Sequence, residues 1–157
     1  GYLSFYRGNY FDAVKHMNKV LEINDSFYPA LIILALSYGE LMEFEKSKNA
    51  LDRVGHNNPT VKSQLGYLFA KQKKNKEAEN QIQILDQDFS MHPFRDYAKS
   101  VIYLALGEID KSAKILQSSV SKNGFVARDL TLGNDPRISL LTHHPNANQL
   151  KGLVMPR

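Results

Sequence analysis

Four small residues recur along this chain at nearly constant spacing, and each is followed four positions later by a large apolar residue. The small residues lie 34, 31 and 34 positions apart, at Ala13, Ser47, Ala78 and Ser112. The large residues that follow them are Met17, Leu51, Ile82 and Leu116. Residues four positions apart lie on one face of an α-helix, one turn from each other. The spacing therefore predicts one helix that returns in each of four units.

A second pattern with the same spacing lies upstream of each of these helices. It begins with a small residue at Gly1, Ala35, Gly66 and Ser100. Three positions later it carries Ser4, Tyr38, Phe69 and Tyr103. Small residues in register let two helices approach closely, and large residues fill the grooves beside them. Each unit is therefore predicted to be a pair of antiparallel helices that needs its neighbours to bury its apolar face.

The stretch from residue 28 to residue 59 shows one complete unit. We expect its two helices at about 29–41 and 44–54, joined by a tight turn. Asn58 and Pro59 are typical of a helix start, with Asn at the cap and Pro in the first turn. The same reasoning places a helix that ends near Ile23, with Asn9 as its N-cap. The remaining helices are expected at about 60–71, 94–106 and 109–121.

In these patterns the chain resembles the tetratricopeptide repeat family, whose units are paired helices of 34 residues. In the unit at 28–59 the resemblance rests on Leu31, Leu34, Ala35, Tyr38, Phe44, Ser47, Leu51, Val54 and Pro59. In the first unit it rests on Gly8, Tyr10, Ala13, Met17 and Val20, and in the later units on the segments 65–85 and 100–120. The chain departs from the family pattern at the glycine of the turn, where two units carry Met42 and Lys73, and at Asn75, which replaces an aromatic residue.

The resemblance implies an all-α fold, a right-handed α-solenoid of antiparallel helix pairs with a short helical cap at its C-terminal end. The repeat array would span residues 1–121, as a partial first unit followed by units at 28–59, 60–90 and 93–121. Residues 122–157 would form the capping segment, with a short helix that starts at Asp135 and Pro136. Because the chain begins part-way through a unit, we expect it to be a piece of a longer protein.

The C-terminal segment carries a further resemblance. The residues from Tyr103 through Leu106-Gly107-Glu108 and the run 134–141 (NDPRISLL) are similar to the tails of bacterial multidomain regulators, in which a tetratricopeptide array follows an effector domain. This resemblance implies a regulatory domain. The absence of Cys from the chain fits a cytoplasmic protein but leaves the periplasm open.

Composition excludes several classes of function. Without Cys the chain has neither disulfides nor a thiolate nucleophile. No apolar run approaches the ~18 residues that a membrane span needs. The net charge of +4 is a mild excess. Lys71, Lys73, Lys74 and Lys76 crowd one turn, which could contact phosphate, but no aromatic residue is interleaved with them. We interpret the lysines as a solvated turn and do not expect nucleic acid to be a partner.

No catalytic arrangement is present in the sequence. A Gly-rich phosphate loop, a His-Glu-x-x-His motif and a nucleophile elbow are all missing. We do not interpret any of the five histidines as a metal ligand, since four of them lie at or near predicted helix ends or turns. We therefore expect a protein that is not an enzyme and that needs no cofactor or metal.

The function is expected on the concave face, which the first helix of each unit lines. Its candidate residues are Tyr2, Phe5, Tyr6, Ile32, Ile33, Leu36, Gln64, Tyr67, Tyr97 and Val101. Most of them are apolar or aromatic, and an exposed apolar patch of a few hundred Å² on a protein surface is typical of a partner site. The leading hypothesis is a module that binds a peptide or protein segment in this groove. The alternative is a structural domain that forms a homodimer or an intramolecular scaffold, in which the protein itself fills the groove.

Overall fold

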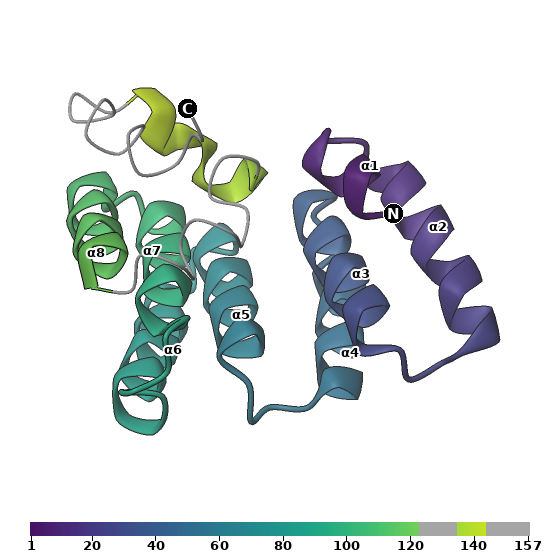
Figure 1. The fold of residues 1–157 in the computed structure, drawn as a ribbon, viewed down its shortest axis with the longest axis horizontal. Coiled ribbons are helices and arrows are strands. Elements are labelled where there is room, and N and C mark those ends of the chain that lie inside the picture. The colour runs from purple at the N-terminus through teal and green to yellow at the C-terminus, as the bar shows by residue number, and fades with distance from the viewer. Residues whose placement is uncertain (123–134, 144–157) are drawn as a thin grey trace.

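The computed structural model describes residues 1–122 and 135–143, which form eight α-helices and one 3-10 helix without any strand (Figure 1). The elements are α1 (Tyr2–Tyr6), α2 (Tyr10–Ile23), α3 (Tyr28–Glu40), α4 (Phe44–Val54), α5 (Pro59–Lys71), α6 (Asn75–Asp88), α7 (Arg95–Ala105), α8 (Ile109–Lys122) and η1 (Pro136–His143). The prediction of an all-α fold is confirmed for these residues. The predicted helix bounds are met to within one or two residues.

Consecutive helices pack as pairs. Contacts join α1 to α2, α3 to α4, α5 to α6 and α7 to α8, and further contacts join α2 to α3 and α5 to α7. Figure 1 shows the pairs following one another along the long axis, from α1 and α2 to α7 and α8. The 3-10 helix η1 contacts α7 and α8. Residues 136–143 therefore pack on the last helix pair.

The four recurring small residues are buried where the paired helices meet. Ala13, Ser47, Ala78 and Ser112 have no exposed surface. The two serines also bind the facing helix, because the Ser47 hydroxyl donates to the carbonyl of Ala35 at 2.6 Å and that of Ser112 donates to the carbonyl of Ser100 at 2.8 Å. The sequence prediction that these four positions lie at seams between helices is confirmed.

The turn inside each helix pair has one backbone conformation in all four cases. A residue with positive φ follows α1, α3, α5 and α7, at Gly8, Met42, Lys73 and Gly107. In each turn the next amide donates to a carbonyl five residues earlier, as Glu43 does to Tyr38 at 2.9 Å and Lys74 does to Phe69 at 2.9 Å. This pair of features is the Schellman motif that ends many helices. Met42 and Lys73 thus adopt the backbone that glycine adopts in the other two turns.

Helix starts are less uniform. Asn58 caps α5 as predicted, since its side chain accepts the amide of Thr60 at 2.8 Å and Pro59 occupies the first turn. Asn9 stands at the N-cap of α2, but its side chain makes no capping hydrogen bond. No helix among the described residues is both long and apolar enough to cross a membrane.

Most of the buried apolar side chains belong to one cluster. It runs from Phe5 in α1 through Leu31 and Leu36 in α3 to Val101 in α7, and it includes Leu141 in η1. A smaller cluster joins α5, α6 and α7 around Leu85 and Ile102. Because η1 contributes Ile138 and Leu141 to the main cluster, this short helix is part of the core that positions the candidate site.

Candidate functional site

The structure buries most of the residues that the sequence assigned to the concave groove. Seven are buried: Phe5, Ile33, Leu36, Gln64, Tyr67, Tyr97 and Val101. Tyr6 and Ile32 are half-buried, and Tyr2 is exposed. The chain's own residues therefore cover these seven positions. Their role in binding a partner stays a prediction.

The 135–143 segment lies among these residues. Ile138 and Leu141 are almost fully buried, and both belong to the same apolar cluster as Leu36, Tyr67 and Val101. The preceding Asp135 and Arg137 are also buried, at 5% and 9% exposure. A buried charged pair is rare unless its members are bonded to each other and to their surroundings. The contacts of this pair consequently define the site.

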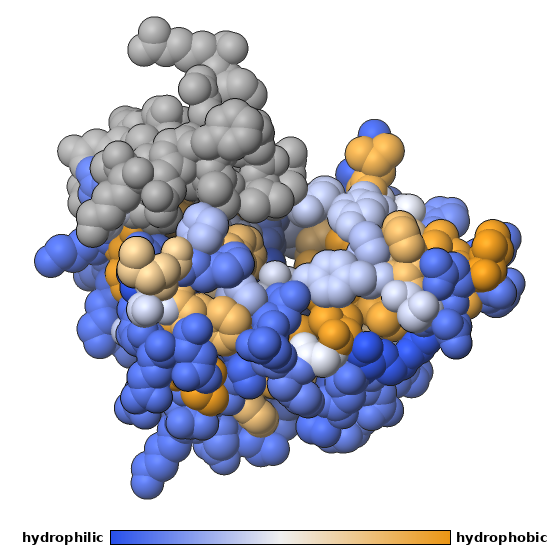
Figure 2. All heavy atoms as spheres, turned by 60° about the horizontal axis from the view of Figure 1, so that its bottom comes forward, coloured by the Kyte–Doolittle hydropathy of each residue, from blue (hydrophilic) through white to orange (hydrophobic). Residues whose placement is uncertain are grey.

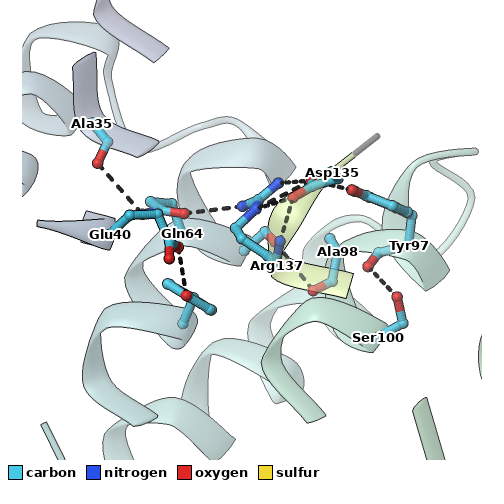
Figure 3. Close-up of polar contacts among 10 residues, drawn as sticks. Ala35, Glu40, Gln64, Tyr97, Ala98, Ser100, Asp135 and Arg137 are labelled. Atoms are coloured by element: carbon cyan, nitrogen blue, oxygen red, sulfur yellow. Dashed lines mark hydrogen bonds and ion pairs between the residues drawn. The ribbon is translucent and has the colours of Figure 1, made fainter. Parts of the chain in front are cut away.

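Arg137 and Asp135 form a close ion pair within the segment. The Nη2 atom of Arg137 lies 2.6 Å from Oδ2 of Asp135, and its Nε lies 3.0 Å from Oδ1. The backbone amide of Arg137 donates to the same Oδ1 at 2.9 Å. The hydroxyl of Tyr97, in α7, donates to Oδ2. The carboxylate thus accepts bonds from the guanidinium, from one amide and from one phenol (Figure 3).

Gln64 connects this ion pair to the helices. Its Oε1 accepts Nη1 of Arg137 at 3.0 Å, and its Nε2 lies 3.5 Å from the carbonyl of Ala35 in α3. Gln64 is fully buried in α5. In Figure 3 it stands between Arg137 on one side and Ala35 on the other. One amide side chain therefore joins α3, α5 and the C-terminal segment across 73 positions of sequence.

A second polar pair lies beside Gln64. The hydroxyl of Tyr67, one turn along α5, donates to Oε1 of Glu40 at the end of α3. The ammonium of Lys71 lies 5.2 Å from the centre of the Tyr67 ring. Burial and the Glu40 carboxylate raise the pKa of Tyr67. The phenol, which is protonated at neutral pH even at its ordinary pKa of about 10, acts as a donor to Glu40.

The electrostatics keep Asp135 and Arg137 charged. Burial alone would raise the pKa of Asp135, but the guanidinium of Arg137 and the bonds from Arg137 and Tyr97 outweigh it and hold that pKa below its usual value. Burial would lower the pKa of Arg137, and the Asp135 carboxylate outweighs that effect and raises it. Burial, together with the charge of Asp135, raises the pKa of Tyr97. The site is therefore a neutralised ion pair held by neutral hydrogen-bonding groups.

The charged groups of the site are bonded to the chain itself. The acidic groups of the site, Asp135 and Glu40, both accept hydrogen bonds from the chain itself. No group of three or more His, Asp or Glu side chains within 1–122 and 135–143 is placed to hold a metal ion. The predictions that the protein is not an enzyme and needs no cofactor stay predictions.

Sequence reasoning placed Gln64, Tyr67 and Tyr97 on one face, and the structure brings them together. It did not anticipate that Arg137 would reach Gln64. The available signal was that Gln64 is a polar position on the predicted concave face, most of whose residues are apolar or aromatic, and a buried polar side chain needs a hydrogen-bond partner. Nothing in the 34-residue spacing points to Asp135 or Arg137, because both lie outside the repeats.

The remaining exposed apolar side chains gather toward the N-terminal end. Figure 2 shows orange patches on the side of the molecule formed by α1–α4, whereas much of the rest of that face is blue. Among the large hydrophobic residues that are exposed, those before α3 and at its start are Tyr2, Leu3, Phe11, Ile23, Phe27 and Tyr28.

The lysine-rich turn is exposed, as predicted for a solvated turn. Lys73, Lys74 and Lys76 lie at the surface, and Lys71 is half-buried over Tyr67.

No protein-family model, curated protein or solved structure shows significant similarity to this chain. The assignment of function therefore rests on the geometry of the chain itself.

Proposed function

We propose that this chain is a non-enzymatic protein-interaction module of the tetratricopeptide type, in which α1, α3, α5 and α7 line a groove that binds a segment of protein. The observation that carries the proposal is the burial of the chain's own 135–143 segment against Leu36, Tyr67 and Val101, with Arg137 bonded to Gln64. A face that buries a segment from 73 positions away through both apolar and polar contacts has the properties of a peptide-binding surface.

The repeat architecture of the proposal is supported by two features with the same spacing. The seams at Ala13, Ser47, Ala78 and Ser112 are all buried. The turns at Gly8, Met42, Lys73 and Gly107 all have positive φ. Side chains and backbone thus repeat in register, as stacked helical repeats require. A right-handed superhelix, a bacterial origin and a regulatory role in a larger cytoplasmic protein belong to the same proposal.

The proposal is tested with the full chain carrying Asp135→Ala and Arg137→Ala, called here the released variant. Removing both charges weakens the hold of the groove on its own segment without leaving one buried charge unpaired. A random peptide library displayed on phage is selected against this variant, and the wild-type chain is the matched control. We expect selected peptides to bind the released variant at least about tenfold more tightly than the wild type. Peptides that bind both chains equally, or no peptides at all, would contradict the proposal.

An intramolecular scaffold is the second candidate function, and the same buried segment favours it. In that case Arg137 and Gln64 serve only to fasten the C-terminal segment to the helices. The released variant would then lose stability but would not gain affinity for any peptide. Circular dichroism melting and the phage selection together separate the scaffold from the binding module.

Homodimerisation, the other structural alternative, is favoured by the exposed apolar side chains of α1 and α2. Leu3 is 70% exposed and Phe11 is 76% exposed. Sedimentation equilibrium over a hundredfold range of concentration measures the oligomeric state directly. Replacing both residues by Glu converts a dimer that uses this surface to a monomer, while a wild-type chain that is monomeric throughout the range rules the alternative out.

A further inference from the structure

The groove around Gln64 contains polar groups that require complementary hydrogen-bonding and charged groups in the segment that occupies it. On the basis of the proposed function, we propose that the partner of this groove is a protein segment with the pattern Asp-Xaa-Arg. In this segment an apolar residue follows the arginine directly, and a second apolar residue lies three positions after the first. The chain's own segment has this pattern in Asp135, Arg137, Ile138 and Leu141. A partner segment with the same chemistry would displace it.

The demand for arginine comes from the way Arg137 divides its donors. Its Nε and Nη2 face the carboxylate of Asp135, at 3.0 and 2.6 Å, while Nη1 reaches Oε1 of Gln64 at 3.0 Å. A planar guanidinium makes contacts in these separate directions at the same time, whereas a lysine ammonium is a single point of charge. Lysine in this position therefore loses one set of contacts in a buried site.

The demand for an acidic residue two positions earlier has two causes. The hydroxyl of Tyr97 donates to Oδ2 of Asp135, so the groove presents a donor that needs an acceptor. The buried guanidinium also needs a counter-charge, because an unpaired charge away from water is strongly unfavourable. Asparagine in place of Asp135 would supply the acceptor but not the charge.

Both members of the ion pair belong to the segment itself. The amide of Arg137 donates to Oδ1 of Asp135 at 2.9 Å, and this local bond fixes the carboxylate beside the guanidinium. A short peptide with the same two residues can make the same local bond without help from the rest of the chain. Preorganisation of this kind lowers the entropy lost on binding.

The receiving groups belong to the helices rather than to the segment. The Nε2 of Gln64 faces the carbonyl of Ala35, and the absence of a side chain at Gly39 leaves the space that Gln64 occupies. Tyr67 is fastened to Glu40 in the same region. When the segment leaves, Oε1 of Gln64 and the hydroxyl of Tyr97 lose their partners, so a segment that restores both bonds is favoured over one that is only apolar.

The inference is tested with a fluorescent peptide of residues 135–143 (DPRISLLTH) and the full-length released variant, by fluorescence anisotropy. We expect the peptide to bind the released variant at least about tenfold more tightly than the wild type, whose own segment competes. Peptides with Lys in place of Arg137 or Asn in place of Asp135 should each bind at least about tenfold more weakly.

Groove variants show whether the preferences arise from the contacts described. Adding Gln64→Leu to the released variant should reduce the preference for Arg over Lys. Adding Tyr97→Phe should reduce the preference for an acceptor (Asp or Asn) over Ala at the position of Asp135, because only the hydroxyl of Tyr97 requires that acceptor. If these two preferences survive the two substitutions, the inference is overturned. If circular dichroism shows that the released variant has lost helicity, Arg137→Lys in the full chain replaces it, because lysine keeps the charge.

Failure of this inference is distinguishable from failure of the proposed function. Phage peptides that prefer the released variant but lack the Asp-Xaa-Arg pattern would overturn the inference and leave the binding module standing. Absence of any groove-dependent peptide would overturn both. Sedimentation of the wild type and the released variant shows whether a second copy of the chain occupies the groove. A dimer that the Gln64→Leu substitution dissociates would overturn the partner-segment inference.

Discussion

The side chain of Gln64 lies in the space that a methyl group on Gly39 would occupy. A Cβ built on Gly39 would come within 2.6 Å of Nε2 of Gln64 and 3.1 Å of Cδ2 of Leu68. Gly39 is buried in α3, and Gln64 is fully buried in α5. The absence of one side chain in α3 thus allows the amide in α5 to reach both Ala35 and Arg137.

We predict that Gly39→Ala destabilises the protein, although alanine favours helix formation more than glycine does by about 1 kcal/mol. The clash displaces Gln64 from its two partners, and overpacking of this kind costs about 1–3 kcal/mol. Urea unfolding followed by circular dichroism measures the change in the free energy of unfolding.

The double variant Gly39→Ala with Gln64→Ala is the control for this prediction. It removes the clashing atoms, so the two substitutions should be less harmful together than the sum of their separate effects. Additive effects would show that the clash with Gln64 does not determine the cost of Gly39→Ala.

Lys73→Gly is predicted to stabilise the protein. Lys73 has a φ of 62°, in the left-handed region, where glycine is free of the strain that other residues carry. The equivalent positions Gly8 and Gly107 already hold glycine. Because Lys73 is exposed, its removal loses little packing, and we expect a gain of about 0.5–1 kcal/mol in the free energy of unfolding.

The matched control is Lys114→Gly in the interior of the helix α8, at a lysine that is also exposed. Glycine inside a helix costs about 1 kcal/mol, so this variant should be less stable than the wild type. Equal losses of stability in the two variants would contradict the role assigned to the backbone at Lys73. Urea midpoints of the two proteins provide the comparison.

Asp135 should make stability depend on pH in the acid range. Its pKa is lowered in the folded state, so its contribution is present above the ordinary pKa of an aspartate, about 4, and is lost as the pH falls through the folded value. The wild type should therefore exceed Asp135→Asn in stability at pH 6, and the difference should shrink below about pH 4. Thermal melts of both proteins between about pH 2 and about pH 7 test this. A difference in stability between the wild type and Asp135→Asn that stays constant over this range would contradict it.

Arg137→Ala is predicted to be more harmful than the double substitution of the released variant. Removing the arginine alone leaves the buried Asp135 carboxylate without its counter-charge, and breaking one partner of a buried ion pair costs about 3–5 kcal/mol. Removing Asp135 as well takes away the unpaired charge. The free energies of unfolding of the two variants, measured in urea at neutral pH, should therefore differ in favour of the double variant, and the reverse order would refute the pairing.

Local patterns were sufficient to predict the helices. Asn58 and Pro59 fixed the start of α5, and the small residues from Ala13 to Ser112 located all four seams. These features depend on interactions within one turn or between adjacent helices, which a spacing of 34 residues reports directly. The positive φ at Met42 and Lys73 could also be inferred from the register, since Gly8 and Gly107 occupy the equivalent positions.

The occupancy of the groove could not be predicted in this way. Tyr67, Tyr97 and Gln64 were assigned to one face from their register, but their burial depends on where a segment outside the repeats returns to the helices. Asp135 was interpreted only as a helix start. The contact between Gln64 and Arg137 produces no repeating pattern in the sequence, because each residue is a single polar position far from the other in sequence.

The sequence by itself therefore determined the helices, their pairing and the small residues on which they pack, because helix formation and seam packing are set by neighbouring residues that recur. Only the tertiary structure decided that the predicted groove holds Asp135, Arg137 and Ile138. A distant segment packs on the helices only if the apolar burial and hydrogen bonds that it gains outweigh the entropy lost when the loop closes. Those contacts are available only after the helices have packed together and formed the face that receives the segment.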